Sequence, residues 1–156
     1  MNTKAINTII IVAVSVLFSM AARAADGATL SEPVKSVYGN YLKIESDLAK
    51  DSLAGVAENA NAIAKTVRGD DAKALPTLVA DQAESVAKAK DLTAAREAFK
   101  PLSKSLIKYL ADNKVPKGTY YEVYCPMARA SWLQANKDVN NPYMGKDMAS
   151  CGIVKD

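Results

Sequence analysis

Five sulfur-bearing side chains gather near the end of this 156-residue chain, and their types are the ones best suited to chemistry. In chain order they are Cys125, Met127, Met144, Met148 and Cys151. The chain has no histidine. Thiolate and thioether ligands without imidazole are the set that a soft monovalent ion prefers, copper(I) above all, with silver as its surrogate. We therefore expect a metal site formed by these five residues.

The spacing of the sulfurs indicates how they would meet. Cys125 and Met127 are two positions apart, so an extended strand would point both side chains to the same face. Met144, Met148 and Cys151 follow one another at intervals of four and three, which one or two helical turns would align. Two such elements that face each other would form a sulfur-lined pocket.

The same two cysteines fit a second interpretation. A disulfide between Cys125 and Cys151 would close a loop and stabilise the fold by restricting the unfolded chain. An oxidising compartment favours this outcome for a chain with two cysteines and no third. Methionines near aromatic rings are also common packing residues. Metal ligands and a disulfide both remain open for this pair.

The start of the chain is typical of an exported protein. Lys4 precedes an apolar run over residues 9–14 that extends to Phe18, and a small-x-small pattern follows at residues 22–24. The apolar run is shorter than the roughly 20 residues that span a bilayer, so residues 1–24 are expected to be a cleaved signal peptide. Residues 25–156 would then be a single periplasmic or secreted domain without a membrane span.

Charge and composition exclude several classes of function. Removal of Lys4 and Arg23 leaves 18 basic residues against 17 acidic ones, a net charge of +1 without the basic excess of nucleic-acid-binding proteins. The lack of histidine removes the usual general base and the Ser-His-Asp arrangement. There is no Cys-x-x-Cys pair and no Gly-rich phosphate loop. We do not expect an enzyme.

Helical periodicity dominates the region from residue 29 to residue 113. Apolar residues recur there at spacings of three and four, which is typical of amphipathic helices. The spacing predicts four helices that begin near Thr29 or Ser31, near Asp51 or Ser52, after Pro76 and at Asp91 or Thr93. Pro101 is expected to kink the last one or to mark a local irregularity in it. Short connections favour an all-α fold, an antiparallel four-helix bundle.

The residues after Asn113 have a different character. Pro116 and Gly118 indicate a turn, and β-favouring residues follow it. The segment 119–152 is therefore predicted to be an irregular or extended Cys- and Met-rich cap, folded over the bundle.

Five further residues of the cap are expected to support the sulfurs: Tyr124, Trp132, Asn141, Pro142 and Tyr143. Tyr124 and Trp132 are candidates for buried anchors of the cap, and an aromatic ring could also cover a bound ion and exclude water. The Asn-Pro pair and the residues after it indicate a turn.

Two blocks of this cap resemble a known family. The blocks are Tyr124-Cys125-Pro126-Met127-Ala128 and Asn141-Pro142-Tyr143-Met144-Gly145-Lys146-Asp147-Met148, which Cys151-Gly152 closes, with Trp132-Leu133 between them. Together with Arg96, Phe99, Leu102 and Ser103 they resemble DUF3347, an exported domain of unknown function. The family motif falls on Cys125, Met127, Met148 and Cys151, whereas Met144 stands where an aromatic residue is expected.

This resemblance implies a helical bundle with a metal-related role, because members of the family are often found with components of copper and silver efflux systems. The sequence thus predicts an exported copper(I)-binding protein for metal capture, sensing or hand-over, with efflux or other envelope proteins as partners. The alternative is a disulfide-stapled structural or adaptor module that docks on another envelope protein without metal.

Overall fold

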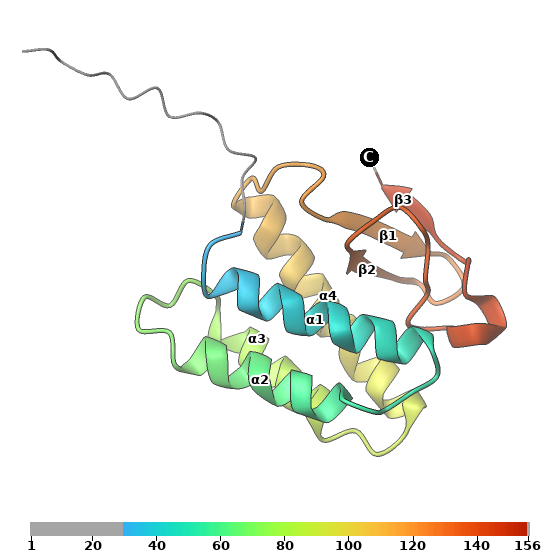
Figure 1. Cartoon of the computed structure of the whole chain (residues 1–156), viewed down its shortest axis with the longest axis horizontal. Helices are drawn as coiled ribbons and strands as arrows, with labels where there is room; N and C mark the ends of the chain where they lie inside the picture. Colours follow the sequence, from blue (N-terminus) through green and yellow to red (C-terminus); the bar gives the residue numbers. More distant parts are fainter. Residues whose placement is uncertain (1–29, 156) are drawn as a thin grey trace, which may run out of the picture.

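The computed structural model describes residues 30–155, and the expected signal peptide at residues 1–24 lies outside them. Four α-helices come first in the described chain, followed by three short strands and one 3₁₀ turn (Figure 1). The helices are α1 (Val34–Ala49), α2 (Val56–Arg68), α3 (Thr77–Ala87) and α4 (Leu92–Asp112). The later elements are β1 (Tyr121–Cys125), β2 (Ala130–Gln134), η1 (Gly145–Met148) and β3 (Ile153–Lys155).

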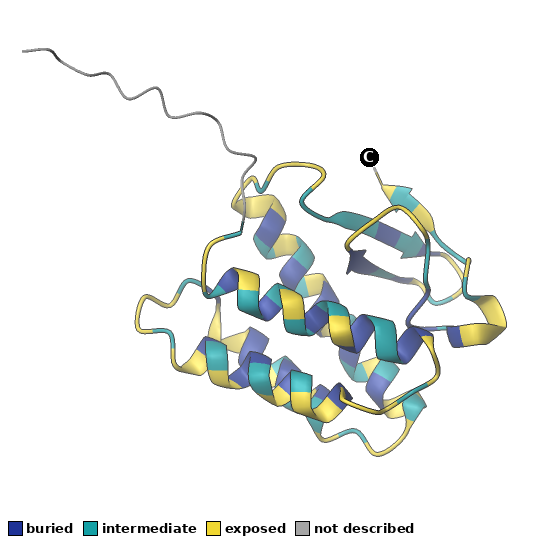
Figure 2. Ribbon diagram, viewed as in Figure 1, coloured by how far each residue is buried: buried dark blue, intermediate teal, exposed yellow. Residues whose placement is uncertain are grey.

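The prediction of four helices is confirmed. Each helix packs on the next along the chain, and α4 also packs on β2. Buried residues form one stripe along each helix, and the opposite side is exposed (Figure 2). Val37, Ile44 and Ile63 are fully buried in the shared core. The stripes seen in the sequence are therefore core, as their spacing indicated.

The predicted helix starts are accurate at α3 and α4 and wrong at α2. Asp91 caps α4 by accepting a hydrogen bond from the backbone N–H of Ala94 at 2.8 Å. The second helix begins at Val56, several residues after the predicted start, because Asp51 and Gly55 both have positive φ and belong to the connecting turn. The fourth helix continues through Pro101.

The predicted fold is confirmed in part: the four helices and an extended C-terminal cap are present, but the fold is not all-α, because residues 119–155, which we call the cap from here on, contain a three-stranded sheet. The strand order is β2-β1-β3 and both pairings are antiparallel. Burial alternates along β1, with Val123 and Cys125 buried and Glu122 and Tyr124 only half-buried. The expected extended segment thus forms a hairpin with β2 through a turn at residues 126–129, in which Arg129 has a φ of 50°.

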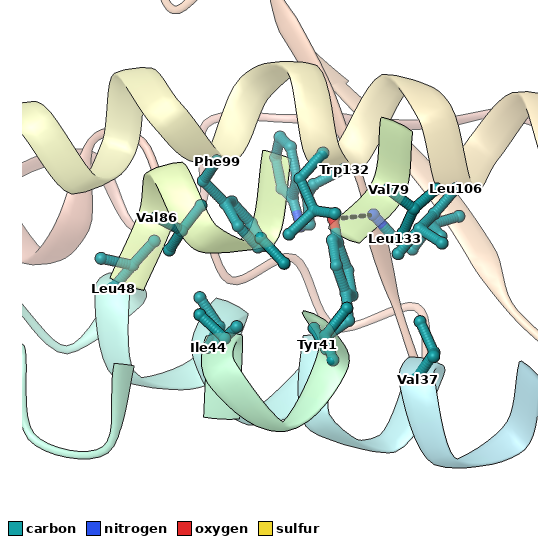
Figure 3. Close-up of a cluster of buried hydrophobic side chains, with 14 of the residues drawn as sticks. Val37, Tyr41, Ile44, Leu48, Val79, Val86, Phe99, Leu106, Trp132 and Leu133 are labelled. Atoms are coloured by element: carbon teal, nitrogen blue, oxygen red, sulfur yellow. Dashed lines mark hydrogen bonds between the residues drawn. The ribbon is translucent and has the colours of Figure 1, made fainter. Parts of the chain in front are cut away.

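The sheet and the bundle share one core. Trp132 and Leu133 of β2 are fully buried beside Tyr41 of α1 and Phe99 of α4 (Figure 3). The rings of Tyr41 and Phe99 stack with 4.7 Å between their centroids. Trp132 is therefore the buried anchor that the sequence predicted, whereas Tyr124 is half-buried.

None of the helices in residues 30–155 has the length and apolar character needed to cross a membrane.

Candidate functional site

The structure brings the two cysteines into contact. Val123 pairs with Val154, and Tyr124 pairs with Ile153, so the antiparallel register carries the residues just before β3 to the end of β1. The Sγ atoms of Cys125 and Cys151 are 2.7 Å apart, and both residues are free thiols. Cys125 is fully buried, whereas Cys151 is partly exposed. The two thiols therefore form one dithiol site, with one side open to solvent.

The two thiols differ in their protonation. Burial raises the pKa of Cys125, but hydrogen bonds from the Cys151 thiol and from backbone N–H groups, including that of Ala128 at 3.4 Å, bring its pKa below the usual value. The pKa of Cys151 is raised, chiefly because its thiol shares a hydrogen bond with Cys125. Cys125 is thus the thiol that loses its proton first and Cys151 the one that stabilises the thiolate.

Close packing at Gly152 holds the second cysteine in this position. A Cβ atom at Gly152 would come within 2.7 Å of Val123 and 2.8 Å of Trp132. Real side chains do not approach so closely, so only glycine lets the residues after Cys151 lie against the sheet. The Cys-Gly pair of the sequence therefore combines a thiol with the residue that positions it.

The three methionines are placed differently from one another. Met127 lies in the turn after β1 and is 66 % exposed, and Met148 ends η1 and is 37 % exposed. Met144 is partly buried and packs against the hydrophobic core. The expectation that Cys125 and Met127 share a strand face is wrong, because β1 ends at Cys125 and Pro126 begins the turn.

The predicted helical alignment of Met144, Met148 and Cys151 is also wrong, because the chain between them does not form an α-helix. Residues 145–148 form a single 3₁₀ turn, and the backbone N–H of Cys151 donates to the carbonyl of Met148 at 3.0 Å. This hydrogen bond closes a turn between Met148 and Cys151. The segment leading to Cys151 is therefore a series of turns rather than a helix.

Asn141 organises the loop that carries Met144 and Cys151. Its fully buried side chain accepts hydrogen bonds from the N–H groups of Tyr143 and Met144 at 2.8 and 3.1 Å, and it donates to the carbonyl of Cys151 at 2.5 Å. An Asn side chain that bonds to the backbone two residues ahead is a common turn device. This agrees with the interpretation of Asn141, Pro142 and Tyr143 as turn residues.

Arg96 of α4 fastens the same loop to the bundle. Its guanidinium donates to the carbonyls of Pro142 and Leu48, both at 2.9 Å, and pairs with the carboxylate of Asp51 at 2.5 Å. The pKa of Asp51 is lowered, first by the hydrogen bond from Arg96 and then by that from the N–H of Lys146. Gly145, at a φ of 60°, leaves the space that these groups occupy, because a Cβ there would overlap them.

A buried chain of hydroxyl groups ties the cap to α1 and α4. The Tyr143 hydroxyl donates to the carbonyl of Ser131 at 2.8 Å and lies 3.1 Å from Ser103 Oγ. Ser103 is 2.7 Å from the hydroxyl of Tyr41, which accepts the N–H of Leu133 at 3.1 Å. Figure 3 draws this last hydrogen bond as a dashed line. Sequence reasoning did not assign these contacts, although a serine on the apolar stripe of a helix was a signal for them.

Glu45 of α1 is a buried carboxyl that sequence reasoning missed. The residue is 6 % exposed, and its Oε1 atom has no hydrogen-bond partner. Burial raises its pKa to about 8, although Lys50 opposes the shift. Glu45 also contributes to the raised pKa values of Tyr38, Tyr41 and Tyr143, in each of which burial is the largest cause. Glu45 is therefore a titratable group near the joint between bundle and cap.

The ligand types near the cysteines restrict the metals that they could hold. Among residues 30–155 there is no group of three or more His, Cys, Asp or Glu side chains close enough to share an ion. The two thiols themselves are soft ligands, the type that copper(I) prefers.

Residues 37–118 match the family described as a protein of unknown function, DUF3347. This match covers more than half of the chain. The chain belongs to the DUF3347 family. No curated protein and no solved structure matches it.

The DUF3347 match covers α2, α3, α4 and all but the first three residues of α1, and it ends before the sheet. It includes Arg96, Phe99 and Ser103, which contact the loop at residues 141–146 in this structure. Helix α4, which lies within the matched residues, thus forms a surface on which the cap packs. The five sulfurs all lie outside the matched residues, so their role remains a prediction from this chain.

Proposed function

We propose that this DUF3347 protein is exported to the periplasm and captures monovalent copper there, with Cys125 and Cys151 as its principal ligands. The observation that carries the proposal is the contact between the two thiols, 2.7 Å apart, in a protein that has no histidine. Two thiolates bind soft ions tightly, and thioethers add ligands that cannot be protonated. The protein would hold copper as cargo and hand it over without chemistry on a substrate.

Met127 and Met148 are the thioethers best placed to contribute. Both side chains reach solvent, and both residues lie within three positions of a cysteine. Met144 has its side chain against the core, so a ligand role for it requires a larger rearrangement. Exposure also suits transfer, because an incoming partner can replace an exposed thioether before it reaches the buried thiolate of Cys125.

Capture requires the two sulfurs to separate. Metal–thiolate bonds of about 2.3 Å, as in zinc sites, place the two sulfurs of a trigonal or linear site roughly 4.0–4.6 Å apart. Cys125 belongs to the central strand of the sheet, whereas Cys151 lies in a turn that is partly exposed. We expect Cys151 to make most of this movement and Cys125 to remain fixed.

The test is an anaerobic copper(I) titration of the reduced, processed protein. One ion per chain should bind in competition with a chelator of known affinity. Replacement of Met127 and Met148 together by leucine should weaken binding by more than tenfold, on the order of 1.4 kcal/mol or more. Met144→Leu is the comparison variant, since it deletes a thioether whose side chain packs in the core. Loss of binding in Cys125→Ser with unchanged helical content would confirm the thiol ligand.

The alternative function, a disulfide-stapled adaptor without metal, has one specific observation in its favour. The sulfur separation of 2.7 Å needs a smaller shift to reach the roughly 2.0 Å of a disulfide than to reach a two-ligand metal site. A free-thiol count on protein taken from its native compartment distinguishes the two. No free thiols, and no copper binding even after reduction, would favour the adaptor and overturn the copper proposal.

A further inference from the structure

Two adjoining hollows lie along the sheet, and neither is lined by Cys125 or Cys151. The first, of about 360 Å³, and the second, of about 430 Å³ between α4 and the sheet, share Glu122 and Lys155 in their walls. Six basic side chains line the two hollows, and we call this surface the basic trough: Lys100, Lys104, Lys117, Arg129, Lys137 and Lys155. The six residues come from α4, β3 and three different turns or loops, so the fold gathers them from distant parts of the chain.

The trough has a charge that the rest of the described chain lacks. Residues 30–155 contain 18 Lys and Arg residues and 15 Asp and Glu residues. The trough has six of the basic residues and, in Glu122, one acidic residue. The remaining residues thus have 12 basic and 14 acidic side chains. A nearly neutral protein has therefore concentrated its positive charge on one face, which attracts anionic groups.

Several of these cations have no counter-charge within residues 30–155. Lys155 pairs with Glu122 and Lys100 with Glu97, each at 2.6 Å. Lys104, Lys117 and Arg129 make no ion pair or side-chain hydrogen bond in the described part of the chain. Unpaired cations around a hollow gain from an external anion, whereas a paired cation must first exchange its partner.

The free edge of strand β3 indicates that the anionic ligand is an extended peptide. Within the described residues β3 pairs only with β1, so its other edge offers backbone N–H and C=O groups to a further strand. Lys155, which lines both hollows, belongs to this strand. An extended peptide can add to such an edge through its backbone while its side chains reach neighbouring pockets.

We propose that the basic trough binds an extended acidic segment of a partner protein, with carboxylates facing Lys104, Arg129 and Lys117. The site is separate from the cysteine pair and does not rest on copper capture. It gives the protein a docking surface whose binding depends on charge and therefore weakens as salt screens the cations.

A fluorescent hexaglutamate peptide, titrated against the reduced, metal-free protein and followed by anisotropy, tests the proposal. Lys104→Glu combined with Arg129→Glu should weaken binding by at least about tenfold. Lys65→Glu combined with Lys90→Glu is the matched control, because both lysines are exposed, lie outside the trough and change the net charge equally. The control should remain within about twofold of the unmodified protein. Lys117→Glu with Lys137→Glu repeats the test at the other hollow, where both residues lie outside helices and strands.

Three results would overturn the proposal. The first is the absence of hexaglutamate binding at low salt. The second is equal weakening by the trough and control variants, since net charge alone would then explain the binding. The third is tighter binding of a hexathymidylate oligonucleotide than of hexaglutamate through the same residues, which would make the trough a nucleic-acid site. Circular dichroism of each variant shows whether it has folded.

Discussion

The helical bundle and the cap are stabilised in different ways. The bundle is packed through apolar stripes in which aliphatic residues such as Ile44 and Ile63 are fully buried. The cap adds Trp132 and Leu133 to the same core, but its loop is fixed by polar contacts from Arg96 and Asn141. Apolar packing tolerates many sequences, whereas a polar network fixes one geometry. The cap is therefore the region in which a precise site can be maintained.

The largest expected effect tests whether bundle and cap unfold together. Trp132→Ala in the cap should lower the free energy of unfolding by about 3–5 kcal/mol, since it empties a fully buried site. Ile63→Ala in α2 is the comparison in the bundle, at about 2–5 kcal/mol. Both variants should show one denaturation transition by far-ultraviolet circular dichroism, because Tyr41, Phe99 and Ser103 contact both regions. Two separate transitions would show that the cap folds independently.

The same difference explains how much the sequence could predict. Four helices followed from apolar spacing, and the start of α4 followed from Asp91, because both signals are local. The sheet could not be predicted in this way, because β3 has only three residues and its position depends on pairing with β1. The contact of Cys125 with Cys151 depends on that pairing. The sequence named both cysteines but not the register that joins them.

Polar contacts across the joint were equally inaccessible to sequence reasoning. Arg96 and Ser103 were noticed through a family resemblance, whereas their partners Pro142 and Tyr143 lie about 40 or more residues away along the chain. No periodicity connects such pairs. Glu45 has a charged side chain on an amphipathic helix, yet it is 6 % exposed and lies close enough to Tyr143 of the cap to contribute to that residue's raised pKa. Tertiary contact outweighs local pattern at each of these positions.

Glu45→Gln should give the next largest change in the free energy of unfolding, and the size of that change depends on pH. The buried carboxyl has its pKa raised from 4.5 to about 8, so its contribution to stability is fully present below pH 4.5 and is lost as pH rises through 8. The variant should therefore be more stable than the unmodified protein above pH 8, by about 1–3 kcal/mol, and similar to it near pH 4. Urea denaturation at pH 4, 7 and 9 measures this difference.

Glu58→Gln is the control for this series, because Glu58 is exposed at the start of α2. Its stability relative to the unmodified protein should change little between pH 7 and 9. If the free energy of unfolding of Glu45→Gln followed pH in parallel with that of the unmodified protein, the Glu45 carboxyl would be ionised and accommodated at neutral pH.

Gly145→Ala should weaken the attachment of the loop at residues 141–146. The new Cβ would overlap the carboxylate of Asp51 and the guanidinium of Arg96, and φ at this position is 60°. The conformational cost alone is about 1–2 kcal/mol. Gly39→Ala is the matched control, since a Cβ there meets nothing within 4 Å inside α1 and should stabilise the helix by about 1 kcal/mol. The midpoint temperatures of thermal unfolding should be lower for Gly145→Ala and higher for Gly39→Ala than for the unmodified protein.

Tyr143→Phe isolates the hydroxyl at the joint and should have the smallest effect, about 1 kcal/mol. The ring can keep its edge contact with Trp132 at 5.8 Å, while Ser131 and Ser103 lose a hydrogen-bond partner. Tyr109→Phe is the control, because the Tyr109 hydroxyl makes no hydrogen bond within residues 30–155. Hydrogen exchange should increase at the cap in Tyr143→Phe and remain unchanged in α2. An equal increase in both regions would mean that this hydroxyl stabilises the whole fold, and the polar joint would then be part of the common core.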